Sequence, residues 1–256
     1  VNLFVNGKRE GVYWQVESFS KDILEKQNIP GDVNLYGSLD FWDAPGSQYL
    51  DFVNIYSWKK YSQDSLSGVI DNYSDLKTFL DIVNNPSDEY FYNNIWNILD
   101  KENFYSWVAQ QYLVTSTHQS GANIRLYFDT TRGKFYFIPW DVSMFSTPPA
   151  LTELNYNAVI TRVLKNPEFL QERYAALWKY VGDDKNLEDD LKRYDELDAL
   201  TRNDFYKDTK KVESTYAYRK NIQKIRDEIR EKFLYLRHNL EDANAFVTVG
   251  VDNKKP

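Results

Sequence analysis

The chain has 256 residues and a net charge of −7, with 31 Lys and Arg against 38 Asp and Glu. This length can bury a large core, and the acidic balance lacks the basic footprint of nucleic-acid binding, so we expect no nucleic-acid partner. Cysteine is absent, which excludes disulfides, zinc–thiolate sites, iron–sulfur clusters and a thiol nucleophile. No run of about 18 apolar residues occurs, so we predict no membrane span.

The first part of the chain predicts mainly strands. Alternating apolar residues on both sides of an Asn-Gly turn predict a β-hairpin over residues 1–17. A short helix follows, which Ser20 is suited to cap, and DVNLYGSL then predicts a third strand. One further strand is expected around Phe52 to Trp58, and SWKKY is also strand-like.

Helical periodicity begins at Ser74. Apolar residues three and four apart predict helices in SDLKTFLDIVNN, EYFYNNIWNIL and KENFYSWVAQQYLVTS. A second hairpin is predicted in IRLYFD and KFYFIPWD, around the turn from Thr130 to Gly133. After Pro148 and Pro149, nearly the whole remainder is predicted to be helical.

The stretch HQSGANIRLYFDTTRGKFYFIPWD has a spacing typical of phosphoryl transfer. In protein kinases a loop supplies an Asp and, five residues later, an Asn, and a second metal-binding Asp follows. Here Asn123 lies five residues after His118, and Asp141 follows the predicted hairpin. The spacing fits, although a histidine stands first, and Asn and Asp are also common at hairpin edges because they stabilise turns.

Several ordered motifs resemble the CotH kinase family, which is named for spore-coat protein H. They are VNLFVNGKREGVYWQVE, NLYG, LDKENFYSWVAQQYLVTSTHQSGANIRLYFD, GKFYFIPWDVSMF and KIRDEIREKFLYLRHNL, and the W-D after F-I-P is the most specific. The resemblance covers most of the chain. It implies an α+β, protein-kinase-like two-lobed fold, with a small β-rich N-terminal lobe and a large, mainly helical C-terminal lobe that contains an embedded β-hairpin.

The resemblance and the element order together predict the domain limits. Residues 1–72 form the β-rich lobe, which we expect to be truncated at its start. Residues 73–250 form the helical lobe, and residues 251–256 are a polar tail. We therefore expect the sequence to be an excerpt of a longer protein.

The resemblance also implies roles for particular residues, with ATP and Mg²⁺ or Mn²⁺ as cofactors. His118 stands where the family has its catalytic Asp. Asp141 would bind the metal that bridges the nucleotide phosphates, with help from Asn123. Gly37 stands where the third strand of the family ends in a phosphate-binding Lys, and Glu17 would point into the cleft.

Three departures from the family pattern fall on functional positions. They are His118 for the catalytic Asp, Gly37 for Lys, and Ser143 for a second acid two residues after Asp141. A histidine lacks the permanent negative charge that holds a cation, and backbone groups replace a missing ammonium poorly. We therefore expect a degraded active site, in a pseudokinase or very weak atypical protein kinase with a residual nucleotide site, or in a structural module that binds nothing.

Each of these residues also has a structural interpretation. His118 is more often a hydrogen-bonded loop residue than a catalyst, Asn123 is equally a turn residue, and Glu17 is equally a charge on an edge strand. Lys59 or Lys60 would supply the missing ammonium from a neighbouring position, although two exposed lysines are the simpler interpretation.

Two rival functions stay open. An active Ser/Thr kinase of secreted or surface proteins would use His118 as its base, because the ordinary pKa of histidine lies near neutrality. A non-catalytic binding module of a surface or polysaccharide-degrading assembly would bind through the aromatic loop around Trp42. The resemblance implies a secreted, cell-surface or spore-coat bacterial protein, whose partner is a protein substrate or a coat component. The sequence leaves the oligomeric state open.

Overall fold

The computed structural model describes residues 1–16, 18–29, 33–38, 52–62, 72–114, 123–142 and 158–252, with the backbone alone for residue 21 and residues 242–252. The chain divides into two compact units, one of residues 18–177 and one of residues 1–17 with 178–256. The described residues form helices and antiparallel strands, which confirms the predicted α+β class. The two-lobed, protein-kinase-like arrangement stays a prediction.

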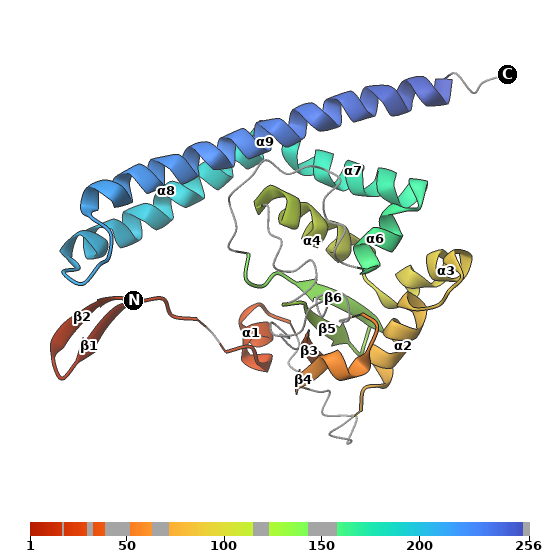
Figure 1. Ribbon diagram of the computed structural model, residues 1–256, viewed down its shortest axis with the longest axis horizontal. Coiled ribbons are helices and arrows are strands. Elements are labelled where there is room, and N and C mark those ends of the chain that lie inside the picture. Colours follow the sequence, from red (N-terminus) through yellow and green to blue (C-terminus); the bar gives the residue numbers. More distant parts are fainter. Residues whose placement is uncertain are drawn as a thin grey trace. The chain divides into compact units, whose positions relative to one another are not determined.

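The unit of residues 18–177 is built on a four-stranded antiparallel sheet with the strand order β4-β3-β5-β6 (Figure 1). Its strands are β3 Asn34–Ser38, β4 Trp58–Ser62, β5 Arg125–Asp129 and β6 Lys134–Ile138. Its helices are α1 Lys21–Lys26, the 3-10 helix η2 Ile55–Ser57, α2 Ser74–Val83, α3 Asp88–Ile98, α4 Lys101–Val114, α6 Ala158–Leu164 and α7 Pro167–Val181, whose last turn belongs to the other unit.

One face of this sheet carries the larger hydrophobic core, because alternate side chains of its strands are aromatic or aliphatic. Phe79 of α2 stacks on Phe135 of β6, with 5.0 Å between ring centroids. Trp107 of α4 stacks on Phe137 of the same strand at 4.3 Å. All four rings are buried. This packing holds β6 firmly and so fixes the strand that leads to Asp141.

The opposite face of the sheet packs on α1 and its flanking residues. Leu35 of β3 belongs to a small buried cluster with Phe19 and Leu24. Gly37 lies two residues beyond Leu35 and therefore on the same face. The two faces thus differ in character, because the second combines a smaller apolar cluster with the polar residues around Gly37.

The unit of residues 1–17 and 178–256 contains a hairpin and two long helices. The hairpin consists of β1 Asn2–Val5 and β2 Lys8–Val12, and the helices are α8 Asp184–Lys207 and α9 Thr215–Asp252. Asn6 and Gly7 both have positive φ angles, of 49° and 75°, as the predicted tight turn requires. The two helices lie side by side (Figure 1), and Arg226 of α9 pairs with Asp195 of α8 at 3.0 Å.

Within this unit, Asp208 at the end of α8 joins the hairpin to the helices. Its Oδ2 accepts a hydrogen bond from the backbone N–H of Val12 at 2.9 Å, and its Oδ1 accepts one from Lys210 at 2.8 Å. Gly11 makes this approach possible, because a Cβ there would lie 2.9 Å from Oδ2 of Asp208. The two backbone hydrogen bonds lower the pKa of Asp208.

The structure confirms most of the predicted elements. Both hairpins, the third strand and the three consecutive helices predicted from Ser74 onward are present, with small shifts at their ends. The second hairpin is also part of a larger sheet, which the sequence did not indicate, because β5 pairs directly with β3. The division into lobes at residues 72 and 73 stays a prediction, although this sheet takes strands from both sides of that boundary.

The strand predicted around Phe52 to Trp58 is placed too early, although SWKKY does lie mostly in a strand. Residues Ile55–Ser57 form the 3-10 helix η2, and β4 begins only at Trp58. The cause is local, because the side chain of Asn54 accepts a hydrogen bond from the backbone N–H of Tyr56 at 3.0 Å and caps the turn. The alternation of apolar residues does not reveal such a cap.

Replacing Phe135 by Ala should destabilise the protein by about 3–5 kcal/mol, because it empties a fully buried site against Phe79. Urea denaturation followed by tryptophan fluorescence measures the change. Leu200→Ala on α8 is the matched control, since Leu200 is 73% exposed, and it should cost less than about 0.5 kcal/mol. Equal losses in the two variants would contradict this description of the core.

Asp208→Asn should loosen the hairpin of residues 1–17, because it removes the negative charge that accepts two backbone hydrogen bonds. A lowered pKa in the folded state means that the stabilisation is present above the ordinary Asp pKa of about 3.9 and is lost as pH falls through the folded value. Hydrogen exchange at Val12 should therefore accelerate in the variant at neutral pH, and in the unmodified chain only at strongly acid pH. Asp81→Asn, on exposed α2 surface, should leave this exchange unchanged.

Candidate functional site

The structure brings Asn123 and Asp141 together. Asn123 lies two residues before β5 begins, and Asp141 lies three residues after β6 ends. Because the strands are antiparallel, with Arg125 opposite Ile138, both residues lie at the same end of the hairpin. The Nδ2 of Asn123 donates a hydrogen bond to Oδ2 of Asp141 at 3.0 Å. The kinase-like spacing of the sequence thus corresponds to a direct contact between two of its members.

Both residues hold a backbone conformation that few residue types adopt. The φ angle is 58° at Asn123 and 49° at Asp141, both in the left-handed region. Asn and Asp enter this region more readily than other non-glycine residues. Left-handed residues other than glycine are uncommon and gather at functional sites. Asn123 is buried and Asp141 is exposed, so the pair joins the protein interior to the surface.

The chemistry of the pair fits a hard divalent cation. Carboxylate and side-chain amide oxygens are ligands that Mg²⁺ and Mn²⁺ accept. Within the described residues, no group of three or more His, Cys, Asp or Glu side chains is arranged to hold a metal by itself. In kinase sites substrate phosphates and water complete the coordination of Mg²⁺, and Asn123 and Asp141 are the residues that would hold such an ion here.

Gly37 lies close to this pair on the sheet and has no room for a side chain. In the sheet register it faces Lys59 of β4 on one side and Arg125 of β5 on the other. A Cβ at this position would lie 2.8 Å from the Cε2 of Tyr61 and 3.1 Å from both the Cδ and the Nη1 of Arg125. The sheet therefore excludes a lysine at position 37 unless these neighbours move.

The two lysines considered as replacements point in different directions. Lys60 is held at the core side of the sheet, where its Nζ donates to the carbonyl oxygen of Asn72 at 2.6 Å and lies over the ring of Tyr36. Lys59 is exposed, on the face that includes Gly37, with its Nζ 4.9 Å from the centroid of the Tyr61 ring. Geometry therefore disfavours Lys60 as a phosphate ligand.

Arg125 is the residue that the sequence interpretation missed. It begins β5, it is 7% exposed, and its guanidinium lies against the rings of Phe19 and Trp140. In the alternation of I-R-L-Y-F, Arg125 falls on the face opposite Ile124 and Leu126, so the sequence alone gave no signal that it is buried. His118, Glu17, Ser143 and Trp42 lie outside the described residues, and their roles stay predictions.

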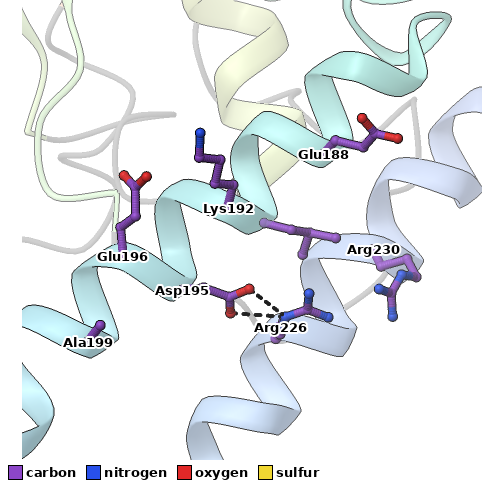
Figure 2. Close-up of a pocket in the computed structure, with 8 residues that line it drawn as sticks. Glu188, Lys192, Asp195, Glu196, Ala199, Arg226 and Arg230 are labelled. Atoms are coloured by element: carbon purple, nitrogen blue, oxygen red, sulfur yellow. Dashed lines mark hydrogen bonds and ion pairs between the residues drawn. The ribbon is translucent and has the colours of Figure 1, made fainter.

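An open groove of about 600 Å³ lies between α8 and α9 (Figure 2). None of the residues that line it is a predicted site residue. Asp195 points toward Arg226 across it, whereas Lys192 and Glu196 point away from α9. Six of its eight lining residues are charged, the others being Leu191 and Ala199, and exposed ion pairs of this kind contribute little to stability. We interpret the groove as the seam of a helical hairpin.

Comparison with known proteins identifies the family. The family model described as CotH kinase protein matches residues 1–236. The chain belongs to this family. Membership in the CotH family confirms the resemblance inferred from the ordered motifs, including the P-W-D motif that ends in Asp141. A search of curated proteins finds none that matches. In the part of the CotH chain that the structure describes, no helix combines the length and apolar content needed to cross a bilayer.

Asn123→Ala should destabilise this CotH protein by about 1–2 kcal/mol, because alanine pays the cost of the left-handed backbone and loses the hydrogen bond to Asp141. Asn123→Gly loses the same hydrogen bond but adopts a positive φ freely, so it should cost less. Urea denaturation compares the two variants. An alanine variant as stable as the glycine variant would contradict the left-handed conformation.

Proposed function

We propose that this CotH-family protein is a pseudokinase, or at most a very weak protein kinase, that keeps a nucleotide and metal site at Asn123 and Asp141. The observation that supports this proposal is the 3.0 Å hydrogen bond between the two side chains at the end of the β5–β6 hairpin. Both residues occupy positions that family resemblance associates with metal binding. This contact favours a site that still binds over one that is lost.

Weak or absent turnover follows from the residues that differ. In phosphoryl transfer a hydroxyl oxygen forms a bond to the γ-phosphorus, the bond to the ADP oxygen breaks, and the hydroxyl proton passes to a base. His118 stands where the family has a carboxylate for this base, and it accepts a proton only in its neutral form. Ser143 stands in place of a second acid, so the site carries less negative charge to hold cations.

The protein should bind ATP in the presence of Mg²⁺ or Mn²⁺, and Asp141→Asn should weaken that binding about tenfold or more, because the metal loses a charged ligand. Isothermal titration calorimetry measures both affinities. Asp81→Asn, which removes an exposed carboxylate of α2, is the matched control and should bind as the unmodified chain does. Equal ATP affinity with and without the Asp141 carboxylate would rule out the proposed site.

A phosphate-transfer assay distinguishes the pseudokinase from the rival active kinase. With labelled ATP and a generic protein substrate, we expect transfer no greater than that of Asp141→Asn. Robust transfer that depends on Asp141 and decreases as His118 becomes protonated below neutral pH would instead favour an active kinase with a histidine base.

The setting of the protein is part of the same proposal. We propose a secreted, cell-surface or spore-coat location and a protein substrate or coat component as partner. These assignments are supported by family membership alone. They fit a protein whose bound nucleotide is recognised by a partner protein, or whose nucleotide-bound conformation is recognised by that partner.

A further inference from the structure

Arg125 is a buried cation without an acidic partner among the residues that the structure describes. Its Nη1 donates to the backbone carbonyl oxygens of Ser38 at 3.2 Å and Ile124 at 3.1 Å. Its Nε is buried and has no hydrogen-bond acceptor within the described part of the chain. Buried charges in proteins are normally paired, because removing them from water is costly. This guanidinium is therefore incompletely satisfied.

The guanidinium is also held in one place. It contacts two aromatic rings that also contact each other, with its Cζ 5.2 Å from the centroid of Phe19 and 5.4 Å from that of Trp140. Two cation–π contacts favour a fixed orientation over a mobile one. The hydrogen bonds from Nη1 to backbone oxygens add a third restraint. The fold therefore fixes the direction in which the Nε–H of Arg125 points.

Gly37 explains why this arrangement is possible. It is paired with Arg125 in the register of β3 and β5, and a Cβ at this position would meet the Cδ and Nη1 of Arg125 at 3.1 Å. The space that a lysine of the family would fill is occupied by the arginine of the facing strand. The absence of a lysine at position 37 and the position of the Arg125 guanidinium therefore have the same cause, which is the close packing of Gly37 against Arg125.

The site residues lie within a few positions of Arg125. Asn123 lies two residues before it, and Trp140, which covers the guanidinium, directly precedes Asp141. The end of the β5–β6 hairpin therefore combines a metal-ligand pair with a fixed cation. A nucleoside triphosphate requires this combination, because a metal and a positive side chain share the charge of its phosphates.

We propose that Arg125 binds the phosphates of the nucleotide in place of the lysine that Gly37 excludes, an inference that rests on the proposed nucleotide site. An arginine donates two parallel hydrogen bonds to phosphate oxygens, and Nε–H lies on one of the edges that can do so. Phosphate binding satisfies the buried Nε and neutralises the charge. The cation that the family supplies from the third strand comes here from β5.

The test measures binding of two probes by the full chain, Mg²⁺–ATP and metal-free inorganic tripolyphosphate, with calorimetry. Arg125→Gln should weaken both about ten- to hundredfold, because it removes charged hydrogen bonds to phosphate. Arg125→Lys keeps the charge but lacks the planar guanidinium, so its affinity for each probe should lie between that of the unmodified chain and that of Arg125→Gln. Gly37→Ala should also weaken binding, since its Cβ displaces the guanidinium without removing it.

Arg132→Gln on the β5–β6 turn is the matched control, because its side chain is 70% exposed and pairs with Asp129 of the same hairpin. It should bind both probes as the unmodified chain does. Urea denaturation of each variant separates loss of a ligand from loss of the fold, and Arg125→Lys serves if Arg125→Gln does not fold.

The outcomes distinguish this inference from the proposed function. Binding of Mg²⁺–ATP that is unchanged in Arg125→Gln overturns the role of Arg125 and leaves the nucleotide site standing. Binding of tripolyphosphate that depends on Arg125, without any binding of Mg²⁺–ATP, supports the phosphate-binding role and overturns the proposed function. A chain that binds neither probe overturns both.

Discussion

The register of β5 between β3 and β6 is the constraint on which the candidate site depends. Pairing with β6 places the residues just before β5 beside those just after β6, so that the side chain of Asn123 meets that of Asp141. Pairing with β3 sets Arg125 opposite Gly37. A shift of one residue would turn Arg125 toward the large aromatic core and separate this cation from the smaller face. The stacked rings of α2 and α4 on β6 resist such a shift.

The charges of the site follow from this geometry. A carboxylate and an amide oxygen suit a divalent ion, and a fixed guanidinium suits the phosphates that such an ion accompanies. Binding needs only these groups, whereas transfer also needs a base and enough negative charge to hold the metal through the reaction. Since the family resemblance implies acids where this chain has His118 and Ser143, we expect binding to be kept more readily than turnover.

Much of this arrangement could be predicted from the sequence, because turn chemistry and periodicity are local. The Asn6-Gly7 hairpin, the helices after Ser74 and the spacing of Asn123 and Asp141 are examples. The pairing of β5 with β3 could not, since it joins residues almost ninety positions apart, as in the pair of Gly37 and Arg125. The proposed role of Arg125 depends on that pairing. From the sequence alone, Gly37 could therefore be interpreted only as the loss of a lysine.

Electron paramagnetic resonance of Mn²⁺ tests the central claim most directly, because the signal reports the ion itself. We expect the protein and ATP together to immobilise Mn²⁺ beyond the effect of ATP alone, and the Asp141→Asn variant to remove that additional effect. A spectrum of Mn²⁺ and ATP that the protein does not change, or that changes equally with Asp141→Asn, would contradict the account of a retained nucleotide and metal site.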